Sequence, residues 1–323
     1  MIGAIEIGGT KLQLAVAAET APEKLLDVHR LPIDRQAGAP GILALIEQTL
    51  TQLTTRYSLS AIGVGFGGPV DVGQGRAITS HQVSGWTNFA LRDWLQQRWP
   101  VPVAIDNDCN VAALAEARLG AGKACSRVLY TTVGTGIGGG FIINGQIDGQ
   151  DRPAITEIGH LRPGLVAERP EMTVEAIASG LGIERTMTEA LQAPGYFGCS
   201  PADADEFRQR LGDTPLSARF IAEQSQAGQL LAVRVFADAT QTLGWALAQA
   251  TTLLAPHVIV IGGGVSLVGQ PFFAAVTHWW HTYVFPPLSK VVHITPAALG
   301  EEVVLHGAIQ LVLSQAAMTS GKG

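Results

Sequence analysis

The sequence predicts an α/β protein built from buried strands and amphipathic helices. Glycines cluster at 8–9, 63–68, 134–140 and 262–264, and the clusters follow the apolar runs AIEI, AIGVGF, VLYTTV and VIVI. Short apolar runs that end at glycine are typical of buried strands in such a sheet. Before the second run, helical spacing produces an apolar stripe made of Ile42, Leu45, Ile46, Leu50 and Leu53.

The predicted elements follow in order along the chain. Gly8-Gly9 joins the first strand to the alternating run LQLAVA, which predicts a hairpin, and the cluster at 134–140 leads into FIIN in the same way. A strand at 103–107 runs into the start of a helix. Residues 217–254 show a long helical pattern before a strand at 257–261, and a last helix starts near 301. The stretch 190–215 is rich in proline and glycine, which predicts a loop.

Two nucleotide motifs fail on their context. Gly134, Gly136 and Gly139 satisfy G-x-G-x-x-G, but a strand follows them, whereas the dinucleotide fingerprint needs a helix there. Lys123 lacks the earlier glycine of a P-loop.

Composition excludes several classes of protein. The 323 residues include 38 glycines, only 15% are charged, and the net charge of −6 comes with no basic cluster. We therefore expect no nucleic-acid partner and no membrane partner. Glu6 and Lys11 interrupt the first apolar stretch, which argues against a signal peptide. Cys109, Cys125 and Cys199 match neither a disulfide framework nor a metal knuckle, so we expect reduced thiols and a cytoplasmic location.

Ordered motifs over nearly the whole chain resemble those of the ROK family (repressors, open reading frames and sugar kinases), within the actin-like ATPase superfamily. They are IEIGGTKLQLAV, GVGFGGPVD, DNDCNVAALAE, TVGTGIGGGFIING, EIGHLRP, VEAIASG and LGWALAQATTLLAPHVIVIGGGV. The resemblance implies an actin-like (ribonuclease H-like) fold of two lobes, each a mixed sheet flanked by helices, with a cleft between them. The lobes would be 1–106, with the helix at 301–323 packing back on it, and 107–300. Repressors of the family carry a helix-turn-helix before the first hairpin, which starts at residue 2 here, so a DNA-binding regulator is not expected.

The resemblance also implies an ATP-dependent kinase that phosphorylates a hexose or N-acetylhexosamine, at O6 and with glucose as the default, together with Mg²⁺ and a homodimer or homotetramer. Glycines let backbone amides point at phosphate, Thr10 adds a hydroxyl and Lys11 a cation, although an ordinary tight hairpin is the alternative. The nucleotide residues implied are Gly8, Gly9, Thr10, Lys11, Thr132, Gly134, Thr135, Gly136, Gly262, Gly263 and Gly264.

Asp108 is the candidate general base. It precedes the helical run NVAALAEARLG, and a helix N-terminus keeps a carboxylate ionised and able to accept a proton. Without the resemblance, a helix cap would be the simpler interpretation. The family's N-D-x-N pattern matches Asn107 to Asn110 and assigns sugar binding to Asn107. Asp106 is a competing carboxylate two positions earlier.

By the same resemblance, the sugar site contains Glu157, His160 and Glu175, with Gly67 and Gly68 as a backbone edge. Carboxylates and an imidazole suit sugar hydroxyls. The alternatives are surface glutamates and a core histidine. His278 and His281 beside two tryptophans indicate packing rather than a metal site.

Three departures from the family pattern matter. The interval HLRPGLVAERPEMTVE lacks the cysteines that bind zinc in relatives, so no zinc is expected. Glu6 stands where an aspartate near magnesium is usual, which leaves it an indirect role at the metal. Gln82 replaces an asparagine, so the preferred sugar need not be glucose. The rival hypotheses are a non-catalytic sugar or nucleotide sensor and an actin- or chaperone-like ATPase.

Overall fold

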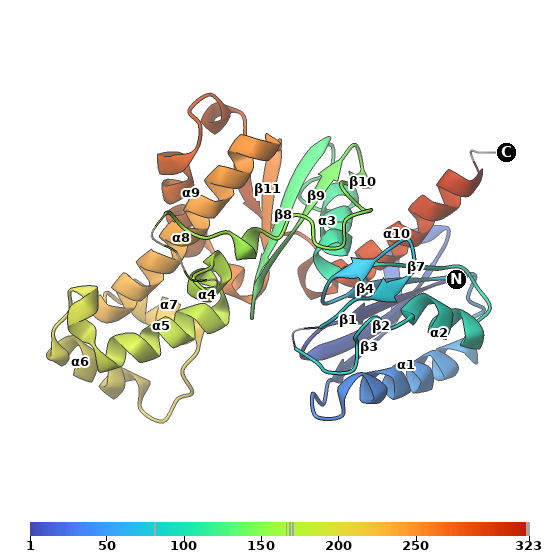
Figure 1. Cartoon of the computed structure of the whole chain (residues 1–323), viewed down its shortest axis with the longest axis horizontal. Helices are drawn as coiled ribbons and strands as arrows, with labels where there is room; N and C mark the ends of the chain where they lie inside the picture. The colour runs from blue at the N-terminus through green and yellow to red at the C-terminus, as the bar shows by residue number, and fades with distance from the viewer. Residues whose placement is uncertain (81, 166, 168, 170, 321–323) are drawn as a thin grey trace. The chain divides into compact units, whose positions relative to one another are not determined.

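The computed structural model describes residues 1–320 apart from 81, 166, 168 and 170 (Figure 1). It confirms the α/β class. Packing divides the chain into two units. Unit 1 contains Met1–Ser126, Gly140–Ile155 and the chain from Ala298 onward, and unit 2 contains Arg127–Gly139 and Thr156–Ala297. Residues 107–126 therefore pack with unit 1, whereas the sequence interpretation placed them in the second lobe.

A five-stranded sheet in the order β3-β2-β1-β4-β7 forms the base of unit 1. Its strands are β1 (Ile2–Ile7), β2 (Lys11–Ala18), β3 (Ala21–Pro32), β4 (Ala61–Phe66) and β7 (Val103–Asn107). β1 and β2 are antiparallel and pair Ile7 with Leu12, which confirms the hairpin at Gly8-Gly9.

The parallel strands of this sheet end in register. Ile7 of β1 pairs with Phe66 of β4, and Phe66 pairs with Asn107 of β7. Because these are the last residues of their strands, the chain segments that follow them leave the sheet at one edge. Three separate motifs of the sequence therefore meet there.

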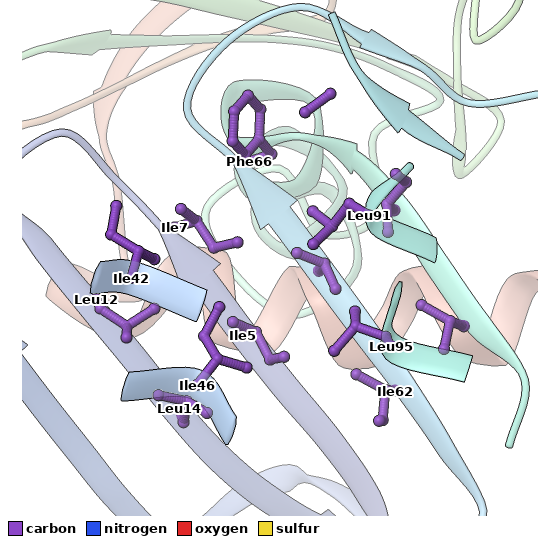
Figure 2. Packing of buried hydrophobic residues seen from close by; sticks show 14 of the residues in the cluster. Ile5, Ile7, Leu12, Leu14, Ile42, Ile46, Ile62, Phe66, Leu91 and Leu95 are labelled. Carbon is purple, nitrogen blue, oxygen red and sulfur yellow. The ribbon is translucent and has the colours of Figure 1, made fainter. Parts of the chain in front are cut away.

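Helices cover both faces of this sheet. Figure 2 shows Ile42 and Ile46 of α1 (Gly38–Thr54) with Leu91 and Leu95 of α2 (Leu91–Arg98) against the strand residue Ile5 and its neighbours. The other face carries α3 (Asp108–Arg118) and α10 (Val303–Ser320). There Gly63 leaves no room for a side chain beneath the carbonyl of Ala308. A short ribbon of β5 (Val70–Asp71) and β6 (Arg76–Ala77) completes unit 1.

The second sheet has the order β10-β9-β8-β11-β12. Its strands are β8 (Arg127–Val133), β9 (Ile137–Ile143), β10 (Gln146–Ile147), β11 (Val258–Gly262) and β12 (His293–Pro296). The helices of unit 2 are α4 (Val174–Ala178), α5 (Gly180–Gln192), α6 (Pro201–Leu211), α7 (Ala218–Gln226), α8 (Leu230–Leu254) and α9 (Gln270–Tyr283). α8 packs against α9, α7, α5 and α4 and so forms the centre of this helical layer.

The helical pattern predicted over 217–254 is confirmed, and the predicted loop at 190–215 is wrong in part. The first range forms two helices, because Gly228 adopts a left-handed φ of 77° and the Gln229 side chain caps α8. The range 190–215 contains the helix α6. Ser200 caps this helix and Pro201 occupies its first turn, where its missing amide costs no hydrogen bond. Among the described helices, none is long and apolar enough to cross a membrane.

Candidate functional site

The first hairpin turns within Gly8 to Lys11. The Gly8 amide donates to the carbonyl of Lys11 at 3.1 Å, and a Cβ atom at Gly8 would lie 3.1 Å from that carbonyl oxygen. At Gly9, the carboxamide of Gln82 occupies the space that a Cβ atom would need. Thr10 is exposed. A side chain at Gly9 would have to displace Gln82, one at Gly8 would press on the hairpin's own main chain, and Thr10 is exposed to solvent.

Lys11 and Glu6 lie together beneath this hairpin. The Lys11 Nζ is 3.6 Å from Glu6 Oε1 and donates to the carbonyl of Glu301 at 3.4 Å. Gln13 Nε2 donates to Glu6 Oε2 at 2.5 Å. Burial raises the pKa of Glu6, which Lys11 and the Gln13 hydrogen bond partly oppose. Each carboxylate oxygen faces a protein nitrogen, and the indirect role of Glu6 at magnesium stays a prediction.

Asp108 begins α3 directly after the end of β7. Its Oδ1 accepts from the amide of Cys109 at 2.8 Å. A Cβ atom added at Gly67 would lie 3.4 Å from Asp108 Oδ2 and 3.5 Å from the Cα of Gly8. The second carboxylate oxygen therefore lies beside Gly67, close to the first glycine hairpin.

Asn107, not Asp108, caps α3. Its Oδ1 accepts from the amides of Cys109 and Asn110 at 2.9 and 3.3 Å, and its Nδ2 donates to the carbonyl of Gly68 at 3.1 Å. The simpler interpretation of Asp108 as the helix cap is thus wrong. Asn107 instead holds the start of α3 against the Gly67-Gly68 turn.

Asp106 is occupied by structural hydrogen bonds. It is 2% exposed and accepts from the Asn107 amide at 2.7 Å, from Asn110 Nδ2 at 3.0 Å and from Gln150 Nε2 at 2.9 Å. Burial raises the pKa of Asp106, and these donors oppose that shift. Of the two carboxylates, Asp108 is the one beside the glycine turns.

The second glycine hairpin joins β8 to β9 in unit 2. The Gly134 amide donates to the carbonyl of Gly136 at 2.9 Å, and the Gly180 amide donates to the carbonyl of Gly134 at 2.7 Å. Glu175 of α4 accepts from the Ile137 amide at 2.8 Å through Oε2. The structure therefore places Glu175 at this hairpin, and its contact with a sugar stays a prediction.

A pocket of about 670 Å³ opens beside this hairpin within unit 2. Gly134, Thr135 and Gly264 form one side of it, and α5, α7 and the turn η3 (Gly264–Val268) form the rest. A Cβ atom at Gly264 would meet nothing within 4 Å. Thr132, Gly136, Gly262 and Gly263 do not line this pocket. The Thr132 hydroxyl instead lies beside Gly263, which has a left-handed φ of 88°.

The sequence interpretation missed the helical walls of this pocket. α7 contributes Arg219, Glu223 and others, its N-cap Ser217 also lines the pocket, and α5 contributes Glu184. Arg219 and Glu223 pair at 3.0 Å, one helical turn apart. An arginine and a glutamate four positions apart are also common on ordinary solvent-exposed helices. The sequence therefore gives no signal that these residues line a pocket.

Glu157 directly precedes the short turn η1 (Ile158–His160) of unit 2, and His160 is its last residue. Thr156, directly before Glu157, is a β-branched residue at a left-handed φ of 58°. Such backbone is strained and must be held by its surroundings. His160 is exposed, so the interpretation as a core histidine is wrong.

No three His, Cys, Asp or Glu side chains come together as metal ligands in the described part of the chain. His278 and His281 each pack against a tryptophan ring, at 5.0 and 4.8 Å between ring centroids.

Curated relatives and solved structures that match nearly the whole chain show a phosphotransferase of the hexokinase type with the actin-like ATPase fold. The ROK family model matches residues 2–315, so the chain belongs to the ROK family. This confirms the family expected from the motifs.

Individual relatives match this chain over nearly their full lengths. A glucokinase of Halalkalibacterium halodurans is 29% identical, with 96% of this chain and 94% of the relative covered. The crystal structure of a ROK family glucokinase from Streptomyces griseus in complex with glucose and AMPPNP has a TM-score of 0.79 at 27% identity, covering 96% of this chain and 98% of that one. A ROK hexokinase from Thermus thermophilus has a TM-score of 0.78 at 28% identity, covering 98% and 99%.

Proposed function

We propose that this protein is an ATP-dependent hexose kinase in which Asp108 is the general base. The observation that carries this proposal is the position of Asp108 Oδ2 beside Gly67 and near Gly8. A carboxylate placed at the turn of a phosphate-binding hairpin can accept a proton where phosphoryl transfer occurs. Asn107 supports this role because it fixes the start of α3 to the carbonyl of Gly68.

In the proposed reaction, Asp108 takes the proton of a sugar hydroxyl, for which O6 is the first choice. The oxygen forms a bond to the γ-phosphorus while the bond from that phosphorus to the β–γ bridging oxygen breaks, and ADP leaves. The amides around Gly8 and Gly9 and the Thr10 hydroxyl hold the phosphate oxygens. Magnesium bound with the nucleotide would neutralise phosphate charge, with Glu6 oriented toward its water shell.

We propose ATP as the donor because of the pocket in unit 2. Its volume of about 670 Å³ lies in the range of small-molecule sites and has room for a nucleoside. Its walls carry two carboxylates, Glu184 and Glu223, and the one arginine among them, Arg219, is paired with Glu223. Such a lining suits a base and a ribose better than a polyphosphate chain. Gly134, Thr135 and Gly264 would border the nucleotide.

We propose a hexose or N-acetylhexosamine as the acceptor, with glucose tested first. Asn107, Asp108, Glu157, His160 and Glu175, together with the Gly67-Gly68 edge, are the proposed contacts. Carboxylates and an imidazole bind sugar hydroxyls as paired donors and acceptors. Gln82, which packs on Gly9, stands where the family usually has an asparagine. Because this difference could change the preferred sugar, other hexoses belong in the same test. We further propose a cytoplasmic homodimer or homotetramer.

Coupled assays of ADP release with glucose, mannose, fructose, allose and N-acetylmannosamine test this proposal. The expected result is sugar-dependent turnover that is lost in Asp108→Asn. If no sugar supports turnover at protein concentrations that bind ATP, the sensor hypothesis replaces the kinase. If ATP is hydrolysed without sugar and Asp108→Asn has no effect, the protein is an ATPase of another kind.

A further inference from the structure

A second cationic side chain lies at the tip of the first glycine hairpin. Arg35, in the segment between β3 and α1, donates from Nε to the carbonyl of Gly9 at 2.9 Å. Two residues earlier, the Ile33 amide donates to the carbonyl of Thr10 at 3.1 Å. These two hydrogen bonds fasten the segment to the hairpin and hold the Arg35 guanidinium at its tip.

The segment that carries Arg35 is itself ordered by further contacts. Asp34 Oδ1 accepts from the amide of Gln36 at 2.9 Å, which closes a local turn. The Ala39 amide donates to the carbonyl of Ser84 at 2.8 Å, and Gln82, from the same loop as Ser84, packs on Gly9. Two loops thus meet at the hairpin. Arg35 is the cationic side chain of these loops that bonds to the main chain of the hairpin.

Lys11 and Arg35 are both cationic, but only the charge of Lys11 is offset by a nearby carboxylate. Lys11 lies 3.6 Å from the buried carboxylate of Glu6, which offsets its charge. Arg35 forms no ion pair with any of the residues that the structure describes, and its side chain is exposed. A guanidinium has five N–H groups, and the bond to Gly9 uses only the one on Nε. The four N–H groups of the two Nη atoms are the ones that can meet a phosphate.

We propose that Arg35 is a catalytic residue that binds the γ-phosphate of the nucleoside triphosphate during transfer, which rests on the kinase function proposed above. Its tether to Gly9 keeps the guanidinium at the glycine hairpin, where charge develops on the phosphate oxygens. A fixed arginine at such a place stabilises the transition state more than the ground state. ADP lacks the γ-phosphate and gains nothing from this contact.

Arg35→Ala and Arg35→Lys test this role, with Gln36→Ala as the control in the same loop. We expect Arg35→Ala to lower kcat by roughly 10²–10³-fold, the usual loss for one oriented donor to a developing anion. Arg35→Lys keeps the charge but not the planar fork and should fall between Arg35→Ala and wild type. Gln36→Ala should retain wild-type kcat. Added guanidinium chloride should restore part of the activity of Arg35→Ala.

Binding separates this inference from the proposed function. Titrations with AMPPNP and with ADP should show that Arg35→Ala weakens AMPPNP and leaves ADP within about threefold, a change below 1 kcal/mol. Equal weakening of both nucleotides, wild-type kcat in Arg35→Ala, or an equal loss in Gln36→Ala would overturn the role of Arg35 while the kinase stands. A wild-type protein that lacks turnover with every sugar would instead overturn the proposed function.

Discussion

Asn107 Nδ2 donates to the carbonyl of Gly68 at 3.1 Å, while Oδ1 of the same side chain caps α3. One carboxamide therefore connects the end of β7, the start of α3 and the turn after β4. Asp108 follows Asn107 directly, so the position of the proposed base depends on this connection.

The two functions of the Asn107 carboxamide can be separated by substitution. Asn107→Ala removes both the cap and the bond to Gly68, and we expect it to lower the free energy of unfolding by about 1 kcal/mol, as for other lost caps. Asn107→Ser keeps an oxygen that can cap the helix but has no amide donor. It should lose less stability in urea than Asn107→Ala yet show a raised KM for the sugar. Equal unfolding free energies of Asn107→Ala and wild type would contradict the capping role.

Gly264 lies on the wall of the pocket in unit 2, with open space where a side chain would begin. We expect Gly264→Ala to fold normally and to raise the KM for ATP by about tenfold, or about 1.4 kcal/mol, because the methyl group enters the pocket. Gly195→Ala is the matched control, since Gly195 also has open space around it but lies outside the pocket. An unchanged KM in Gly264→Ala would show that the nucleotide binds elsewhere.

Glu6 predicts a dependence of stability on pH. Burial raises its pKa above the ordinary value of 4.5, so the folded state holds the proton more tightly than the unfolded state. Stability therefore falls as pH rises from about that value through the raised pKa, and the unfavourable contribution is complete above it.

Glu6→Gln removes this titration, and we expect its melting temperature to exceed that of the wild type near pH 8 but not near pH 4. Its turnover should fall if Glu6 faces the water shell of magnesium as proposed, because the substitution removes that carboxylate. Thermal melts across this range check the first point and ADP-release assays check the second. A constant difference in melting temperature at every pH would rule out the titration of Glu6.

α10 and α3 approach so closely that a Cβ atom at Gly307 would collide with the carbonyl of Val111. Gly307→Ala should therefore separate the helices and lower the free energy of unfolding by about 1–3 kcal/mol, which is the usual cost of overpacking. Urea denaturation measures this change, with Gly195→Ala again as the control. A stabilised Gly307→Ala would show that the two helices do not pack at this distance.

Much of unit 1 was predictable because local pattern and tertiary environment agree. The runs AIEI and AIGVGF form buried strands, and the glycines after them form the expected turns.

Helix α6 of unit 2 was missed because proline and glycine suggested a loop. Pro201 lies in the first turn of this helix, where proline is tolerated.

The roles of neighbouring acids could not be predicted from the sequence. Asp106 and Asp108 carry the same charge and lie two positions apart in one motif. Only the hydrogen-bond partners of Asp106 show that its role is structural. Glu116 lies in an ordinary helical pattern, yet it is fully buried and accepts from the amides of Ala121, Ala298 and Leu299. Such partners are distant in sequence, so no local pattern reveals them.

The turnover of Asp108→Asn tests the central claim most directly. This nearly isosteric change removes the proton acceptor and leaves the backbone around it unaltered. We predict a loss in kcat of roughly 10²–10⁴-fold with glucose, or with whichever sugar the wild type phosphorylates, while binding of ATP and of the sugar stays close to wild type. Wild-type kcat in Asp108→Asn would contradict the assignment of Asp108 as the general base.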